Sequence, residues 1–304
     1  MGSEWRTDAA QLSHDADQGR AAGLRPALGG VIQIGIKLIA IDVDLTLIGG
    51  DLKIAERTKA AIRAAVEAGC AVTLASGRMF RATLPFAEEL GLDAPLVAYN
   101  GALIKTVKTR EIISHRPVPL EHAREVIAYA RREGLHLNVY MDDTLYVECY
   151  DDEALAYMTH CKVEAVAVGD LGAFVDHPPT KLLVVASEED VDRRLPEFKA
   201  HFGDRLQVVR SLPRYVEFTA AGVSKGSALA LLTQRLGISR EEVMALGDSE
   251  NDISMLEFAG IGVAVRNAAE DVKNAADYVT DGESGNGVAE AIFQFVIGPG
   301  IAPS

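Results

Sequence analysis

The sequence predicts an α/β fold in which a parallel sheet forms a core domain and a second α/β domain is inserted into it. Short apolar runs alternate with helical stretches from Ile36 to about residue 99, and the same texture returns from Val223 onward. Such runs are typical of parallel strands, because helices cover both faces of their sheet. Between about 103 and 213 the strands have polar edges and the helices are acidic, which indicates an insertion.

The core elements follow one another as strand and helix units. An apolar strand at 36–42 precedes a helix at about 54–68, and Gly69 stands where a helix C-cap is expected. The remaining core elements are a strand at 71–75, a helix at about 78–90, a strand at 95–99, a helix at 224–236, a strand at 243–246, a helix at 250–258, a strand at 262–265 and a helix near 285–296.

The insertion has its own set of predicted elements. Strands are expected at 135–140, 144–149, 163–167, 180–186 and 206–210, and helices near 120–133, 152–160 and 188–201. We therefore divide the chain into a flexible N-terminal tail at 1–33, a core domain made of 34–102 and 214–304, and an inserted domain at 103–213.

Composition excludes several classes of function. A chain of 304 residues with 48% hydrophobic residues fits about two globular domains. Its formal charge of −14 disfavours binding to nucleic acid or anionic membranes. No run approaches the ~18 apolar residues of a membrane span, and the first 30 residues lack the apolar stretch of a signal peptide. Cys70, Cys149 and Cys161 show no metal-site spacing, so we read them as core or surface thiols of a cytoplasmic protein.

Two carboxylates follow the first predicted strand, at Asp42 and Asp44. Open α/β sheets bind ligands beyond the carboxyl ends of their strands. One carboxylate can attack phosphorus while the other moves a proton to and from the substrate oxygen. The alternative is a turn in which Asp44 only caps the following segment.

Two further strand or helix ends offer groups that bind anions. Ser76 and Gly77 follow the second strand, where a hydroxyl and backbone N–H groups can donate to phosphate oxygens. Alternatively, Ser76 is the N-cap of the helix at 78–90. Lys225 begins a helix and can join the positive helix end beside an anion, although a lone lysine there is usually a solvated surface charge.

Acidic residues crowd the end of the strand at 243–246, in the segment Asp248-Ser-Glu-Asn-Asp252. This crowding is costly unless a cation neutralises it or the acids act as caps. Mg²⁺ suits the segment, because it prefers a few carboxylate oxygens, waters and substrate phosphate, whereas the spacing of an EF-hand calcium loop is absent. A simple N-cap role for Asp248 or Ser249 is the alternative. Together, the four chain segments predict a site for phosphoryl transfer.

The chain resembles the haloacid dehalogenase superfamily of phosphohydrolases, in particular the Cof-type branch with a type IIB (C2B) cap. The resemblance spans about 36–297 and implies a Rossmann-like core with an inserted α/β cap. Its motifs are Asp42-Val-Asp-Leu-Thr46, Ala75-Ser-Gly-Arg78, Asn100-Gly101, Gly222-Val-Ser-Lys-Gly226 and Gly247-Asp-Ser-Glu-Asn-Asp252, followed by residues 262–268 and 287–289.

The resemblance also implies roles for individual residues. Asp42 would be the nucleophile and Asp44 the general acid/base. Ser76, Gly77, Lys225 and Asn251 would hold the phosphoryl group. Mg²⁺ would be bound by the Asp42 carboxylate, the backbone carbonyl of Asp44 and Asp248, with Asp252 supporting the metal.

The implied activity is Mg²⁺-dependent hydrolysis of small phosphomonoesters, such as sugar phosphates or FMN, through an aspartyl-phosphate. A phosphomutase of the same fold and a phospho-accepting signalling protein without turnover are the alternatives. The insertion would act as a lid over the substrate. By location alone, its candidate substrate contacts are Asn138, Tyr140, His160, His177 and Lys181.

Leu45 departs from the glycine that relatives usually carry at this position. We expect its branched side chain to exclude a positive φ and to narrow the site beside Asp44.

Overall fold

The computed structural model describes residues 35–298, so the tail predicted at 1–33 lies outside the described residues. The core contains a five-stranded sheet in the order β14-β13-β12-β1-β2, in which every pair is parallel. Its strands are β1 (Leu38–Ile41), β2 (Ala71–Leu74), β12 (Val243–Gly247), β13 (Ile261–Ala264) and β14 (Tyr278–Val279). The predicted α/β fold with a parallel core sheet is confirmed.

The parallel sheet continues through a small antiparallel one. A parallel bridge joins Ala75 to Val97 in β3 (Leu96–Ala98). Strands β4 (Leu103–Lys105) and β5 (Ile112–His115) then extend it: β4 pairs antiparallel with β3, and β5 with β4. Neither β4 nor β5 was predicted, because both are short and β5 is largely exposed.

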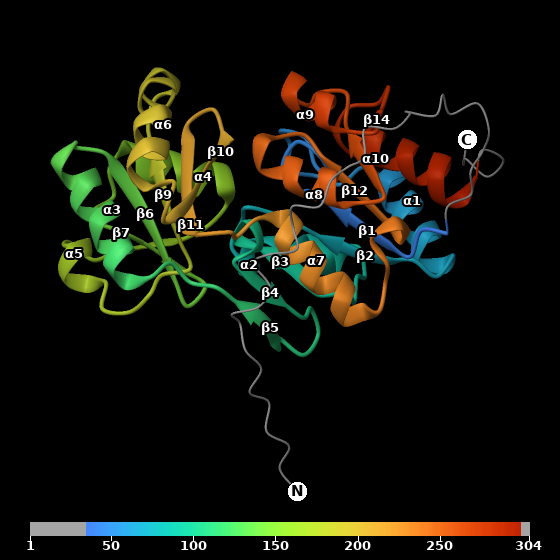
Figure 1. The fold of residues 1–304 in the computed structure, drawn as a ribbon, viewed down its shortest axis with the longest axis horizontal. Coiled ribbons are helices and arrows are strands. Elements are labelled where there is room, and N and C mark those ends of the chain that lie inside the picture. Colours follow the sequence, from blue (N-terminus) through green and yellow to red (C-terminus); the bar gives the residue numbers. More distant parts are fainter. Residues whose placement is uncertain (1–34, 299–304) are drawn as a thin grey trace, which may run out of the picture. The chain divides into compact units, whose positions relative to one another are not determined.

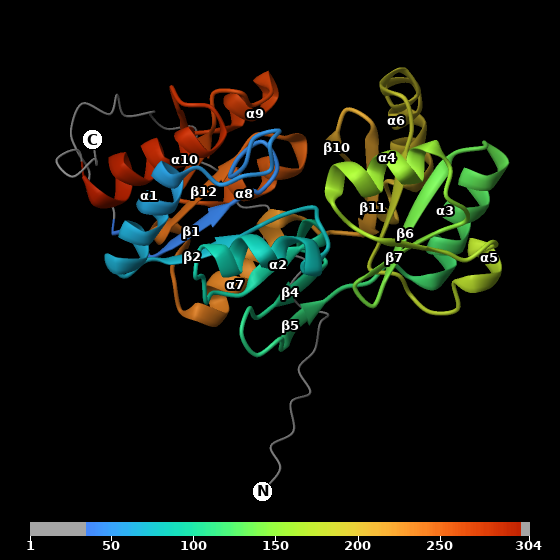
Figure 2. The same ribbon diagram turned by 180° about the vertical axis from the view of Figure 1, so that it is seen from behind.

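Helices cover both faces of the core sheet (Figures 1 and 2). The side chains of β1 alternate: Ile39 and Ile41 pack in one apolar cluster, Leu38 and Ala40 in another, as the two-residue period of a strand requires. The first cluster includes residues of α1 (Glu56–Glu67) and α10 (Ser284–Ile292), and the second those of α7 (Lys225–Leu236) and α8 (Ile253–Phe258). The remaining core helices are α2 (Phe80–Glu89) and α9 (Glu270–Ala275).

A separate six-stranded mixed sheet is built by residues between the core segments, in the order β10-β11-β9-β6-β7-β8. Its strands are β6 (His136–Met141), β7 (Thr144–Val147), β8 (Ala165–Ala167), β9 (Lys181–Val185), β10 (Leu206–Leu212) and β11 (Tyr215–Ala220). We call residues 120–220, which carry this sheet, the cap. Strand β11 was not predicted, because the charged Glu217 interrupts its apolar pattern although Glu217 is buried.

Cap helices lie on both faces of this sheet. Helices α3 (Leu120–Arg132) and α6 (Glu188–Phe202) share one face, where the rings of Tyr129 and Phe198 meet at 5.5 Å. The apolar residues of α4 (Asp152–Cys161) pack on the other face with Tyr140 and Leu183, and the short α5 spans Leu171–Phe174. The acidic first turns of α4 and α6 follow capping side chains, Asp151 and Ser187, an arrangement that stabilises helix N-termini.

Strand pairing bears on where the insertion begins and ends. Strand β4 pairs with β3 of the core and β5 pairs with β4, whereas β11 pairs with β9 and β10 of the cap. We propose that the domain boundaries lie near 116–119 and 221–223, both later than the predicted boundaries around 103 and 213.

No helix in the described part of the chain is long and apolar enough to cross a membrane. All three cysteines are free: Cys70 and Cys161 are buried and Cys149 is exposed.

Leu45 has a φ of 60°, so the expectation that its side chain excludes a positive φ is wrong. Its backbone carbonyl accepts hydrogen bonds from Asn267 Nδ2 (2.9 Å) and Ser284 Oγ (2.8 Å). A left-handed conformation costs a non-glycine residue about 1–2 kcal/mol. The two hydrogen bonds hold the carbonyl in place and offset this strain, while the side chain is 40% exposed.

The strain at Leu45 predicts the effect of glycine there. Leu45→Gly removes the left-handed penalty, whereas Leu236→Gly, at a helical leucine that is 41% exposed, adds a helix penalty. We expect the free energy of unfolding of Leu45→Gly to exceed that of Leu236→Gly by about 1–2 kcal/mol in urea titrations. Equal losses in the two variants would show that Leu45 carries no strain.

Candidate active site

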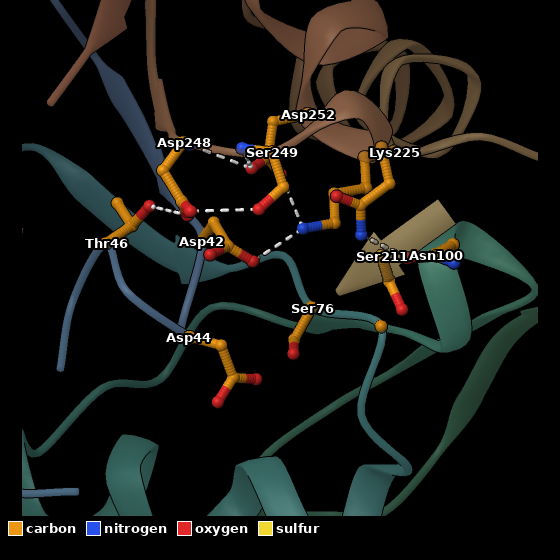
Figure 3. Close-up of polar contacts among 12 residues, drawn as sticks. Asp42, Asp44, Thr46, Ser76, Asn100, Ser211, Lys225, Asp248, Ser249 and Asp252 are labelled. Carbon is orange, nitrogen blue, oxygen red and sulfur yellow. Dashed lines mark hydrogen bonds and ion pairs between the residues drawn. The ribbon is translucent and has the colours of Figure 1, made fainter. Parts of the chain in front are cut away.

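The chain segments that were predicted to form a site meet at one edge of the parallel sheet (Figure 3). Asp42 follows β1, Ser76 follows β2 and Asp248 follows β12, while Lys225 is the first residue of α7. Adjacent parallel strands bring their carboxyl ends to the same edge. Asp42, for example, donates its backbone N–H to the carbonyl of Leu246, one strand away (3.0 Å).

Lys225 lies fully buried at the centre of this edge. Its Nζ donates to Asp42 Oδ1 and to Asp252 Oδ1, each at 2.5 Å. Burial by itself lowers the pKa of Lys225, but the charges and hydrogen bonds of Asp252 and Asp42 outweigh it and raise the pKa. Lys225 is therefore a buried cation, and the alternative of a solvated surface charge is wrong.

Three buried carboxylates surround this cation, and each places one oxygen within 4.8 Å of the others: Asp42, Asp248 and Asp252. Burial and the nearby Asp252 raise the pKa of Asp42 well above its ordinary value, although Lys225 opposes this. Burial and Asp252 also raise the pKa of Asp248 to about 6. One ammonium does not neutralise three carboxylates, so this donor set fits a metal ion.

Asp252 supports the acidic loop from behind. Its Oδ2 accepts hydrogen bonds from the backbone N–H groups of Asp248 and Ser249, both at 3.0 Å. The carboxylate packs against Gly247, where a Cβ atom would lie 2.4 Å from Asp252 Cβ. Ser249 forms a capping box with Asp252 over the 3₁₀ turn η3 (Glu250–Asp252), so the cap role foreseen for Ser249 coexists with the acidic group.

Asp248 is oriented by two hydroxyl groups. Thr46 Oγ1 donates to its Oδ1 (2.7 Å) and Ser249 Oγ to its Oδ2 (2.9 Å). Thr46 lies on the loop after β1, four residues from Asp42. Its role was not predicted from the sequence, although it belongs to the same short motif.

The candidate phosphate-binding residues lie beside this group. Ser76 is buried and its Oγ accepts from the N–H of Arg78 (3.1 Å). Helix α2 begins at Phe80 and has Met79 as its N-cap, so the alternative of Ser76 as its cap is wrong. Gly77 and Asn251 line one small cavity together with Asp42.

Asp44 lies apart from the other carboxylates but lines the same cavity (Figure 3). It accepts two hydrogen bonds from Arg78, from Nε at 2.7 Å and from Nη2 at 2.6 Å. Arg78 Nη1 donates in turn to the carbonyl of Cys161 in the cap (3.2 Å). The sequence indicates Arg78 only as part of a motif; its position two residues after Ser76 is the available signal for a role at the site.

The cap closes this cavity from the other side. Of the five cap residues singled out from the sequence, His160 and Lys181 line it. Tyr140 is buried and contacts Tyr157, while Asn138 is buried and contacts His136. His177 is exposed and pairs with Asp176 and Asp142. Six lining residues of the cap were not predicted, namely Tyr157, Cys161, Ser211, Leu212, Tyr215 and Glu217.

Comparison with known proteins agrees with this geometry. A family model described as haloacid dehalogenase-like hydrolase matches residues 39–292. The phosphatase YcsE of Bacillus subtilis, named for 5-amino-6-(5-phospho-D-ribitylamino)uracil, is 32% identical over 87% of this chain and 97% of its own. Among solved structures, TM0651 of Thermotoga maritima is 33% identical, with a TM-score of 0.73 over 84% of this chain and 96% of its own.

A second solved structure, described as the HAD subclass IIB sugar phosphatase BT4131, is 26% identical, with a TM-score of 0.74 over 86% of this chain and 99% of its own. The similarity thus extends over both the core and the cap, and over nearly the whole length of each relative. The chain belongs to the haloacid dehalogenase superfamily and is a Cof-type phosphatase of subclass IIB.

Proposed function

We propose that this phosphatase hydrolyses small phosphate monoesters with Mg²⁺ and that Asp42 is its nucleophile. The observation that carries the proposal is the position of Asp42, which lines the cavity and at the same time contacts Lys225 and the Asp248 group. A carboxylate at the floor of a small cavity, next to a buried cation, can reach a phosphorus atom that enters from the cavity. Its charge is stabilised there by Lys225.

In the first step, a carboxylate oxygen of Asp42 forms a bond to phosphorus as the bond to the leaving oxygen breaks. Asp44 lines the same cavity and donates the proton that the leaving oxygen needs. In the second step, a water molecule attacks phosphorus, Asp44 takes its proton, and the bond to Asp42 breaks. Lys225, Ser76 and the N–H of Gly77 hold the phosphoryl oxygens, and Asn251 contacts them from the other side.

The acidic group would hold Mg²⁺ through Asp42, the carbonyl of Asp44 and Asp248, with Asp252 supporting it. When bound, Mg²⁺ supplies positive charge that reduces repulsion between the carboxylate and the phosphate. Both oxygens of Asp252 accept hydrogen bonds from the protein, which supports its assignment as a supporting residue.

Substrates of this class would be phosphorylated metabolites with a hydroxylated carbon chain. YcsE is named for a phosphoribityl compound and BT4131 for sugar phosphates, and we propose this chemistry for the present chain. His160 and Tyr215 of the cap would face the leaving group.

We further propose a cytoplasmic setting, since a reducing compartment keeps buried thiols such as Cys70 and Cys161 free. We propose no role with nucleic acid or membranes, because the net charge is −14.

Removal of the nucleophile tests the mechanism. Asp42→Asn is expected to reduce phosphate release from an aryl phosphate at least about 10³-fold, because the amide cannot form the covalent intermediate. Asp93→Asn, at an exposed carboxylate that pairs with Lys108, is the matched control and should keep full activity. Free phosphate would be measured with and without EDTA. Persistent phosphate release by Asp42→Asn would exclude the mechanism. A product in which the phosphoryl group has moved to another hydroxyl group of a sugar phosphate would indicate a mutase.

The role of Asp44 depends on the leaving group. Asp44→Asn should slow hydrolysis of an alkyl phosphate about 10²–10⁴-fold, because an alkoxide needs a proton to leave. A nitrophenolate leaves without one, so the same variant should lose less activity on p-nitrophenyl phosphate. Steady-state kinetics on both substrates give the comparison, and an equal loss on both would argue against proton donation by Asp44.

The raised pKa of Asp248 predicts a dependence of stability on pH. The ordinary pKa of an aspartate is 3.8, and in the folded protein the pKa of Asp248 is raised to about 6. A carboxylate with such a raised pKa lowers the free energy of unfolding as the pH rises between these two values. In EDTA at pH 8, the free energy of unfolding of Asp248→Asn should therefore exceed that of the wild type by about 2–3 kcal/mol. The variant should accordingly unfold at a higher temperature.

The difference between the two proteins should shrink as pH falls toward 5, where the wild-type carboxyl takes up its proton. With Mg²⁺ present the order should reverse, because only the wild type gains stability from the metal. Calorimetric scans at several pH values measure both effects. Identical scans for the two proteins in EDTA would show that Asp248 is not strained by burial.

A further inference from the structure

A second buried ion pair lies in the cap, at the side that faces the active site. Lys181 on β9 and Glu217 on β11 are joined at 2.8 Å, and their side chains are only 1% and 4% exposed. Removal of both charges from water is costly, and a pair of apolar residues would often be at least as stable. Stability alone therefore does not explain why Lys181 and Glu217 are buried here.

Both members of the pair reach across to the core. Lys181 Nζ donates to the carbonyl of Gly77 at 2.6 Å. Glu217 Oε2 accepts from Nδ2 of Asn100 at 2.8 Å. Its other oxygen, Oε1, accepts from Ser211 Oγ within the cap at 2.6 Å.

The core partners are connected to the phosphate-binding residues. Asn100 Oδ1 accepts from Asn251 Nδ2 at 3.0 Å, and the backbone N–H of Asn100 donates to the carbonyl of Ser76 at 3.0 Å. Asn100 holds a left-handed conformation with φ 56°. In Figure 3, Asn100 and Ser211 lie beside the group formed by Lys225 and the three buried carboxylates. A continuous chain of hydrogen bonds thus runs from Lys181 through Glu217 and Asn100 to Asn251.

Direct contact with the leaving group is the competing role, because Lys181 and Glu217 both line the cavity. Most of their hydrogen-bonding capacity is already used within the protein, which argues against this role. Glu217 already accepts three hydrogen bonds. Lys181 already donates two and lies 5.0 Å from the centre of the Tyr140 ring, a cation–π distance.

We propose that Lys181 and Glu217 are positioning residues, which complete the phosphate-binding site from the cap by holding the Gly77 turn and, through Asn100, the side chain of Asn251. This inference rests on the proposed role of Gly77 and Asn251 in phosphate binding. It couples the seating of the cap to the affinity for the phosphoryl group, whichever leaving group is attached.

The test uses the full-length variants Lys181→Met, Glu217→Gln and the double variant. A hydrogen bond that involves a charged group is worth about ten- to a hundredfold in an equilibrium constant. We expect kcat/KM to fall by about that factor, and by the same factor for p-nitrophenyl phosphate, a hexose phosphate and a short alkyl phosphate. Inorganic phosphate should bind more weakly by a similar factor in calorimetry. The double variant should lose little more than the worse single variant, because the pair acts as one unit.

Lys199→Met is the matched control. It removes another ion pair between cap and core, Lys199 to Glu250 at 2.8 Å, whose side chains are 45% and 35% exposed. This control should keep its phosphate affinity and kcat/KM. The same loss in Lys199→Met would overturn the proposal, because any weakening of the attachment between cap and core would then suffice.

Two further results would also overturn it: a loss confined to hydroxylated leaving groups with phosphate binding intact, or folded variants with unchanged kinetics. The single variants leave one charge buried without its partner and can therefore fail to fold. In that case Asn100→Gly breaks the same chain of hydrogen bonds without leaving an unpaired charge, and glycine fits the positive φ. This variant should lose kcat/KM by the same factor for all three substrates. Phosphate calorimetry needs no turnover, so it tests the inference even if the wild type hydrolyses none of these esters, a result that would refute the proposed function alone.

Discussion

The buried ammonium of Lys225 is the interaction on which the active site depends. It joins a carboxylate that follows β1 to one that follows β12, Asp42 and Asp252. Without this cation, the three carboxylates would be buried within 4.8 Å of one another, and among residues 35–298 no other cation forms an ion pair with them. Charges removed from water are tolerated only where they are paired and hydrogen-bonded, so Lys225 makes this group of carboxylates compatible with folding.

Close backbone approach makes this arrangement possible. Helices α7 and α8 lie so near each other that a Cβ atom at Gly226 would be 2.2 Å from the carbonyl oxygen of Ser254. Gly247 leaves the corresponding room for Asp252. Each glycine stands directly beside a charged residue of the site, Lys225 and Asp248. The absence of two side chains thus sets the distance between the helix that carries the cation and the loop that carries the acids.

The turn formed by Ser76, Gly77 and Arg78 connects the site to the cap. Arg78 holds the carboxylate of Asp44 and reaches the carbonyl of Cys161, while Lys181 holds the carbonyl of Gly77. One short segment of the core therefore carries two of the proposed phosphate-binding residues and contacts the proposed acid/base and two parts of the cap. Movement of the cap would change the surroundings of both ends of the substrate together.

The sequence by itself determined the parallel core sheet and the order of its elements along the chain. It also determined the strand ends that carry Asp42, Ser76 and Asp248 and the helix start that carries Lys225. It could do so because apolar periodicity is local and because strand ends converge in any parallel sheet. Only the tertiary structure decided which side chains pair: Arg78 with Asp44, 34 residues apart, and Glu217 with Asn100, 117 residues apart. Strand β11 and the left-handed conformation of Leu45 were also not predicted. The buried charge in β11 and the positive φ of Leu45 are tolerated only because distant residues supply their hydrogen bonds.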